Sequence, residues 1–214
     1  NEFYQRKQYA EAITNYSELI RLQPKSEVGY YNRGQSYYFS GKYDLAVEDY
    51  SQVLRLKPAY NDALYQRGLA YNRSGKHSLA IADYSQCLVA QPENSEVYYN
   101  RGLAYSDSGN PDLAMQDYNK AIKIRPTYVK ALVNRSGLYF KKKDYPQALA
   151  DVTEAIKLDP SYAEAWNNRG VCYSASKQFD LAMADYDQAL KLNPNFAKVY
   201  LDRGILEVRK AEND

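Results

Sequence analysis

The sequence has few of the side chains from which metal and redox sites are built. Its 214 residues include two cysteines and one histidine. A disulfide framework or a structural zinc site needs several such residues at short spacing, whereas Cys87 and Cys172 belong to no close motif. We therefore expect both cysteines to be small buried side chains, and we expect the protein to bind no metal and no cofactor.

A strong charge of one sign and a long apolar run are also lacking. The formal net charge is +2, which is too close to neutral to indicate nucleic-acid binding by electrostatics. No run of about 18 apolar residues occurs, so we expect no membrane span. Few cysteines suit a reducing compartment, and we expect a cytoplasmic location. Because the chain has no initiating methionine and begins within the repeat pattern described below, we expect a fragment that lacks the native N-terminus.

Signatures of catalysis are missing as well. The single histidine, His77, falls at an expected turn between helices, and we interpret it as a surface residue. The glycines form no phosphate-binding loop, and the carboxylates lie at positions where solvation is expected, without the apolar pocket that tunes a general acid. The sequence therefore predicts that the protein is not an enzyme.

What the sequence does contain is a strict repeat. Prolines recur every 34 residues, at Pro24, Pro58, Pro92, Pro126, Pro160 and Pro194. A constant period of this length indicates one supersecondary unit stacked on copies of itself. We number repeat positions from Glu27 and treat 1–214 as a single array. It comprises a partial repeat at 1–26, full repeats at 27–60, 61–94, 95–128, 129–162 and 163–196, and a half repeat or capping helix at 197–214.

Each repeat is predicted to form two helices. The first carries apolar or aromatic residues at repeat positions 4 and 11 and a small residue at position 8, as in Tyr98, Tyr105 and Gly102. These spacings place the three on one helical face. The second helix carries alanine at position 20 and, in most copies, tyrosine at position 24. Because glycine inside a helix costs about 0.5–1 kcal/mol relative to alanine, its recurrence indicates close packing of two antiparallel helices.

This pattern resembles the tetratricopeptide repeat family over essentially the whole chain. The residues that carry the resemblance are the aromatic–small–aromatic first helix, the small residue in the second helix and the closing proline. The resemblance implies an all-α fold, a right-handed superhelix (α-solenoid) of antiparallel helix pairs. It also implies a concave groove lined by the first helix of each pair, a face that typically binds peptides or protein segments in this family.

Arginine at position 7 and aspartate at position 23 recur in every full repeat. The arginines could be anchors for a ligand or partners in structural ion pairs. We favour the structural ion pairs, because a planar guanidinium suits a two-point bond with a carboxylate. The predicted pairs join Arg33, Arg67, Arg101, Arg135 and Arg169 to Asp49, Asp83, Asp117, Asp151 and Asp185, respectively.

By the family's geometry, positions 2, 5, 6, 9, 12 and 13 face the groove. The carboxamides at position 6 form a ladder similar to the asparagine ladder in the superhelix of O-GlcNAc transferase, and a carboxamide can both donate to and accept from a peptide backbone. The expected peptide-binding residues are Asn32, Gln66, Asn100, Asn134, Asn168 and Asp202 at position 6, Tyr31, Tyr65 and Tyr99 at position 5, Leu69, Leu103 and Val171 at position 9, and Tyr38 and Phe140 at position 12. Two alternatives stay open: the amides bond only to neighbours or water, and some rings only pack on the next helix.

The charges at positions 2 and 13 are mixed, with Arg73 early and Glu164 late, and they indicate a weak drift from acidic to basic along the groove. Acidic residues such as Asp62 and Glu96 come first, and basic residues such as Lys141 and Lys198 come later. The fourth full repeat departs most from the pattern, with Ser136 at position 8 and Val152 at position 24. We interpret its run of lysines at 141–143 as a solvated loop.

The predicted function is a non-catalytic scaffold that binds an extended peptide or protein segment in the concave groove. An alternative is a self-assembling structural or adaptor protein, because uncapped ends could stack chain on chain. An RNA-binding helical repeat is less favoured, since such proteins need a basic groove. The clamp that co-chaperones of this family use for a C-terminal carboxylate is rejected, because its lysine, asparagine and arginine are missing at positions 5, 9 and 6. We therefore expect a protein or peptide partner, without nucleic acid or membrane.

Overall fold

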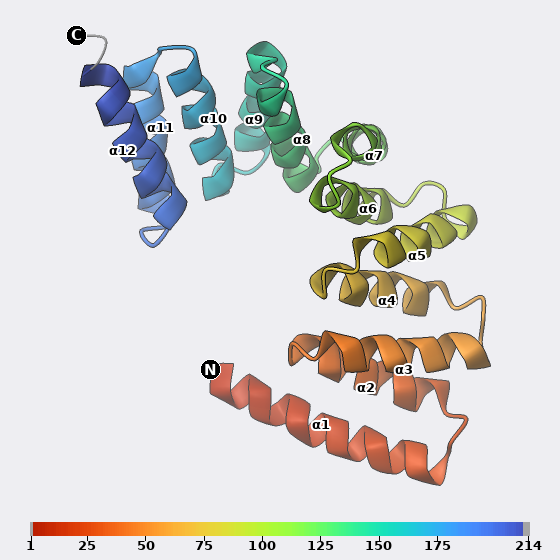
Figure 1. Ribbon diagram of the computed structural model, residues 1–214. Helices are drawn as coiled ribbons and strands as arrows, with labels where there is room; N and C mark the ends of the chain where they lie inside the picture. The colour runs from red at the N-terminus through yellow and green to blue at the C-terminus, as the bar shows by residue number, and fades with distance from the viewer. Residues whose placement is uncertain (1, 212–214) are drawn as a thin grey trace. The chain divides into compact units, whose positions relative to one another are not determined.

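The computed structural model describes the backbone of residues 2–211 and the side chains from residue 8 onward; over this range the chain contains twelve α-helices and no strand (Figure 1). In chain order they are α1 (Glu2–Leu22), α2 (Glu27–Phe39), α3 (Tyr43–Leu56), α4 (Asn61–Arg73), α5 (His77–Ala90), α6 (Ser95–Asp107), α7 (Pro111–Ile124), α8 (Val129–Lys141), α9 (Tyr145–Leu158), α10 (Ala163–Ala175), α11 (Phe179–Leu192) and α12 (Ala197–Ala211). Each predicted full repeat therefore contains two helices. Residue 1 of the predicted partial repeat and residues 212–214 of the predicted half repeat lie outside the described range.

The chain divides into two compact units, 1–117 and 118–214, with the boundary inside α7. In the first unit, each of the helices α1 to α5 packs on the next, and α4 also contacts both α2 and α6. In the second unit, α8 to α12 pack in the same consecutive way, and α10 contacts both α8 and α12. Within each unit, the first helices of successive repeats are therefore neighbours.

The predicted close approach of the two helices is built from a glycine and a tyrosine. It occurs in the pairs Gly34–Tyr50, Gly68–Tyr84 and Gly170–Tyr186. At Gly170, an added Cβ would lie 2.6 Å from Cε1 of the Tyr186 ring and 3.2 Å from the backbone oxygen of Ala182. The tyrosine ring thus occupies the space that any larger residue at position 8 would need.

The fourth full repeat keeps this packing with a different pair of residues. Ser136 replaces the glycine and Val152 replaces the tyrosine, and both side chains are buried. The Ser136 hydroxyl donates a hydrogen bond to the backbone oxygen of Val133 at 2.7 Å. Because valine is smaller than tyrosine, it leaves room for the serine side chain, so the two exceptions in the sequence compensate each other in volume.

Each arginine at position 7 of a full repeat forms a two-point ion pair with the aspartate sixteen residues later. The five pairs have Nε–Oδ2 distances of 2.7–2.8 Å and Nη2–Oδ1 distances of 2.6–2.8 Å. The aspartate side chains are only 5–7% exposed and the arginines 18–20%. In the first four pairs, Nη1 also donates to the preceding repeat, at Ser17, Ser51, Ser85 and Asn119.

Aromatic rings complete the surroundings of these guanidinium groups. The Arg101 guanidinium carbon lies 5.5 Å from the centroid of the Tyr98 ring and 5.8 Å from that of Tyr105, which come from positions 4 and 11. In the last full repeat, Trp166 takes the place of the first ring at 4.8 Å from Arg169. The position-7 arginines of the full repeats are therefore held by bonds within and between repeats, which ties the helices together rather than presenting a row of free cations.

Two turns between paired helices carry lysine in a left-handed backbone conformation. Lys143 has φ of 62° and Lys177 has φ of 60°, whereas the equivalent turns contain Gly41, Gly75 and Gly109 at φ of 74–79°. This conformation is about 1–2 kcal/mol less favourable for a residue with a side chain, whereas glycine adopts it without strain. The run of lysines at 141–143 thus begins in the last residue of α8 and continues into a strained turn.

We expect Lys143→Gly to raise the free energy of unfolding by about 0.5–1 kcal/mol, because the relief of strain exceeds the extra unfolded-state entropy of glycine. Urea unfolding followed by circular dichroism measures the change. Gly109→Lys is the matched reverse substitution and should lower stability. A Lys143→Gly variant that is less stable than the parent would contradict this account of the turn.

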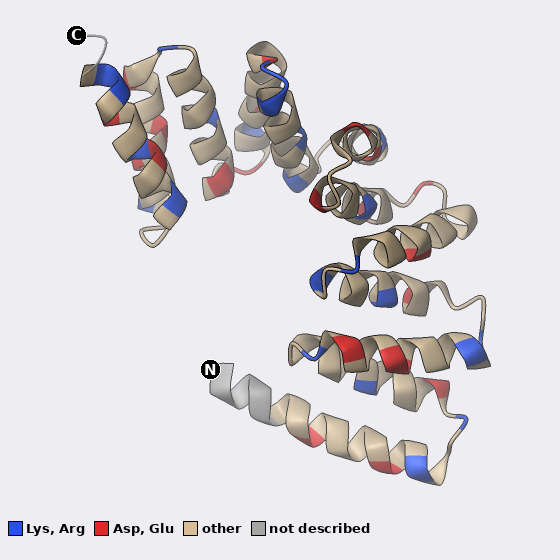
Figure 2. Ribbon diagram, viewed as in Figure 1, with Lys and Arg blue, Asp and Glu red and all other residues tan. Residues whose placement is uncertain are grey.

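Between residues 2 and 211, no helix combines the length and the apolarity that a membrane span requires. Figure 2 shows basic and acidic residues interspersed along the helices of each unit.

Candidate functional site

All six position-6 side chains predicted to form the ladder are half-buried, so each keeps part of its surface accessible. Two bonds join position 6 to position 5 of the preceding repeat. Asn100 Nδ2 donates to Tyr65 Oη at 2.8 Å. In the second unit, Asn167 Nδ2 donates to Asp202 Oδ2 at 3.1 Å. This link between successive first helices favours the alternative that these members of the ladder pair with neighbours.

Both N–H groups of the Asn100 amide already donate hydrogen bonds within the protein. Its Nδ2 also donates to the backbone oxygen of Glu96 at 3.0 Å, and the Tyr65 hydroxyl donates to Glu96 Oε1 at 2.8 Å. By contrast, the side chains of Asn32 and Asn168 form no hydrogen bond with any residue whose side chain the structure describes. These two amides are therefore the members of the ladder that are free to bond with a partner.

The predicted tyrosines of the groove are half-buried and pack partly on their neighbours. The Tyr31 ring stacks on Tyr60 at 5.5 Å between centroids and meets the edge of Tyr50 at 5.8 Å. Burial raises the pKa of the Tyr31 hydroxyl. Tyr38 similarly meets the edge of Tyr43 at 5.5 Å. These rings contribute to helix packing and leave only part of their area for a ligand.

Position 5 changes character in the second unit. Val133 is 5% exposed and Asn167 is fully buried. The Oδ1 atom of Asn167 has no hydrogen-bond partner within the described part of the chain. The expectation that this position faces the groove therefore does not extend to these two repeats, because both side chains are buried.

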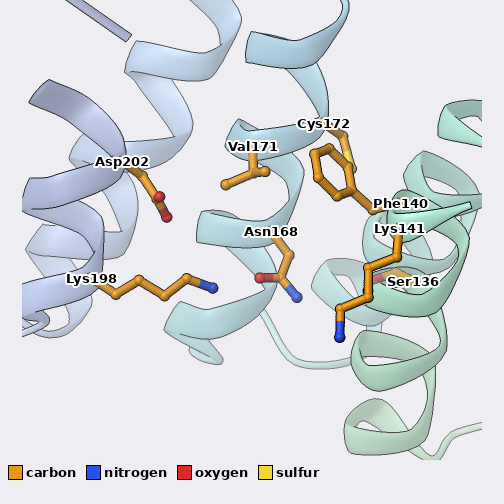
Figure 3. A pocket seen from close by; sticks show the side chains of 9 residues that line it. Ser136, Phe140, Lys141, Asn168, Val171, Cys172, Lys198 and Asp202 are labelled. Atoms are coloured by element: carbon orange, nitrogen blue, oxygen red, sulfur yellow. The ribbon is translucent and has the colours of Figure 1, made fainter. Parts of the chain in front are cut away.

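A cavity of about 300 Å³ opens between three successive first helices of the second unit (Figure 3). It is lined by Ser136, Gly137, Phe140 and Lys141 from α8, by Asn168, Val171 and Cys172 from α10, and by Lys198 and Asp202 from α12. Four residues predicted for the groove thus come together here: Phe140, Asn168, Val171 and Asp202.

The cavity has an apolar floor and a polar rim. Figure 3 shows Phe140 and Val171 above Asn168 in the view, with the Lys141 and Lys198 side chains reaching toward the Asn168 amide from opposite sides. Both lysines are exposed, and neither forms an ion pair with any residue in the described range. The arrangement offers a free amide and two free cations above a surface suited to an aliphatic or aromatic group.

Gly137 is not among the residues that the repeat pattern predicts for the groove, yet it creates much of this space. It stands at position 9, where Leu69, Leu103 and Val171 stand in other repeats, and an added Cβ would meet no atom within 4 Å. The signal for it is present in the sequence, since it is the one position-9 glycine among the full repeats. It is obscured by Ser136 beside it, which makes the serine–glycine pair look like a shifted copy of the usual glycine.

The first unit holds a smaller cavity of about 200 Å³ between α4 and α6, with residues of α5 and the following turn at its edge. Asp62, Tyr65 and Glu96 are among its lining residues, which include two carboxylates and no lysine or arginine. The cavities of the two units therefore have opposite electrostatic character, in line with the drift from acidic to basic residues in the sequence.

Two family models match the chain. The model described as TPR repeat matches residues 1–39, 34–75, 68–109 and 138–176, and the one described as tetratricopeptide repeat matches 95–128 and 163–196. The chain belongs to the tetratricopeptide repeat family. The resemblance predicted from the sequence is thereby confirmed, and proteins with these repeats are generally protein-interaction scaffolds.

Solved structures with the same repeats share the fold. YrrB, described as a TPR protein with an unusual peptide-binding site, superposes with a TM-score of 0.67 at 20% identity over 88% of this chain and 97% of its own. A chain of the APC/C hetero-tetramer Cut9–Hcn1 gives a TM-score of 0.78 at 21% identity over 95% of this chain and 40% of its own. Yeast Tom70 gives 0.73 at 20% identity over 94% and 43%, respectively. No curated protein matches the sequence.

The tetratricopeptide helices place no cluster of reactive groups together within the described range. No group of three or more histidine, cysteine, aspartate or glutamate residues there could hold a metal ion. Burial raises the pKa of both the Cys87 and the Cys172 thiol to about 11, so neither is an activated nucleophile. His77 Nδ1 lies 2.7 Å from Asn72 Oδ1 at the start of α5. The chemistry of the site is therefore that of hydrogen bonding, charge and apolar contact.

Proposed function

We propose that this tetratricopeptide chain is a non-catalytic scaffold that holds an extended segment of a partner protein against its first helices. The cavity between α8, α10 and α12 carries the proposal. It places a free amide and free cations above an apolar floor, which is the mixture of groups that binds a polypeptide backbone and its side chains.

The position-7 arginines support the same conclusion by elimination. In the full repeats they are occupied by the buried aspartates, so the groups left for a partner are those at the other first-helix positions. The peptide-binding site in the name of YrrB, which has the same fold, is consistent with this use of the repeats. Self-assembly is the competing function, and analytical ultracentrifugation over a range of concentrations distinguishes it.

Asn168→Ala should weaken binding of an extended peptide about five- to tenfold, because one hydrogen bond to the peptide backbone is lost. The peptides are first selected from a random display library on the immobilised parent chain, and their affinities are then measured by fluorescence anisotropy. Gln147→Ala is the control, since it removes an exposed carboxamide from the second helix α9. If the library yields no peptide, or if the two variants bind alike, the proposed docking surface is wrong.

A further inference from the structure

Gly137, which lines the second-unit cavity, lacks the packing reason that explains Gly34, Gly68 and Gly170. Gly170 is required because the Tyr186 ring lies against it, whereas Gly137 faces open space. Glycine within a helix costs about 0.5–1 kcal/mol relative to alanine. At position 137 no packing contact offsets this cost. The absence of a side chain there instead keeps the cavity open beside Phe140 and Val171.

The rim of the cavity selects for negative charge. Lys141 and Lys198 both point toward Asn168 from different helices and have no ion-pair partner in the described range. The single carboxylate of the lining, on Asp202, accepts a hydrogen bond from Asn167. Two lysines and one aspartate give the lining a net positive charge, and the aspartate is already hydrogen-bonded to Asn167.

We propose that this cavity binds an acidic residue within an extended segment, together with an apolar residue two positions away. The acidic side chain lies between Lys141 and Lys198, and the apolar side chain enters the space above Phe140 and Val171 that Gly137 leaves open. Side chains two apart in an extended chain point to the same side and are separated by about 6.5 Å. The Asn168 amide then bonds the backbone of the segment.

This inference rests on the proposed function, and it adds the chemistry of the partner. The first-unit cavity, with Asp62 and Glu96 in its lining, disfavours such a segment. Recognition of an acidic residue is therefore a property of α8, α10 and α12 rather than of the repeat in general, since it depends on two lysines and one glycine that differ from repeat to repeat.

The test uses the full chain and two display selections, one on the parent and one on Lys141→Glu/Lys198→Glu. The parent should enrich peptides with aspartate or glutamate two positions from leucine, isoleucine, valine or phenylalanine. The charge-reversed variant should lose this preference and enrich lysine or arginine instead. Lys123→Glu/Lys191→Glu, which changes the same charge at exposed positions on the second helices α7 and α11, should select as the parent does.

The second measurement is the affinity of one enriched acidic peptide for the parent chain and for each variant. The peptide is synthesised with an amidated C-terminus. Binding should fall at least about tenfold in the charge-reversed variant and in Gly137→Leu, and by less than about twofold in the control. Because nothing opposes a side chain at position 137, Gly137→Leu should keep or raise the melting temperature, which separates a filled cavity from a misfolded chain.

The possible outcomes separate the two proposals. Peptides that are selected without an acidic preference overturn this inference and leave the proposed function standing. Binding that requires a free C-terminal carboxylate and tolerates loss of the acidic side chain also overturns it. Failure to select any peptide on the parent chain overturns both.

Discussion

Gly170→Leu should lower the free energy of unfolding by about 2–3 kcal/mol, because the new side chain enters a space already filled. A Cβ at this position would lie 2.6 Å from the Tyr186 ring and 3.2 Å from the Ala182 backbone oxygen. The ring is 1% exposed, so it is enclosed by close-packed neighbours. The helices α10 and α11 would have to separate. Urea unfolding and thermal melting, both followed by circular dichroism, measure the loss.

The fold provides two matched comparisons for this prediction. Gly137→Leu makes the same substitution in α8, where an added Cβ meets no atom, and it should not destabilise the chain. Gly170→Ser combined with Tyr186→Val copies the Ser136–Val152 pair of the neighbouring repeat. The double variant should lose less stability than the sum of its single substitutions, since each change compensates the volume of the other. Additive losses, or equal losses at positions 137 and 170, would contradict the packing argument.

Asp83→Ala should cost about 3 kcal/mol, because it removes both hydrogen bonds from the half-buried Arg67 guanidinium. The carboxylate receives Nε at 2.8 Å and Nη2 at 2.7 Å, and its side chain is 7% exposed. Among the residues whose side chains are described, the charge that stays behind then has Ser51 Oγ, at 3.1 Å, as its one hydrogen-bond partner. The measurement is again the free energy of unfolding in urea.

An exposed ion pair in the same unit is the control. Lys76 Nζ lies 2.8 Å from Asp44 Oδ1, but the aspartate side chain is 71% exposed. Asp44→Ala should therefore change stability by less than about 0.5 kcal/mol. A double-mutant cycle with Arg67→Ala and Asp83→Ala should show a strong favourable coupling. Zero coupling would mean that the repeated arginine–aspartate pairs do not hold the repeats together.

Much of the architecture follows from local pattern. Glycine at position 8, alanine at position 20 and the closing proline at position 32 all lie within one repeat. The packing that they specify therefore forms within a single helix pair. The partners Arg33 and Asp49 lie sixteen residues apart, and the same geometry recurs wherever the same two residues recur. Short-range spacing therefore predicts the helix pairs and the bonds inside them.

The groove depends instead on contacts between successive repeats. The bond from Asn100 to Tyr65 spans 35 residues and occupies an amide that the sequence pattern offers to a ligand. Asn167 likewise bonds to Asp202 of the next repeat, and its burial removes a position expected to face the groove. Neither can be predicted from repeat position alone, because the tilt between neighbouring helices determines which side chains meet.

The periodic sequence establishes a tetratricopeptide array of paired helices, because each pair is specified by residues within its own 34-residue period. The assembly of α8, α10 and α12 determines where a partner can be held. There, Gly137 leaves space, and Lys141 and Lys198 approach Asn168 from separate helices. The three helices come from successive repeats, and it is the stacking of first helices, rather than any local propensity, that makes these residues one site.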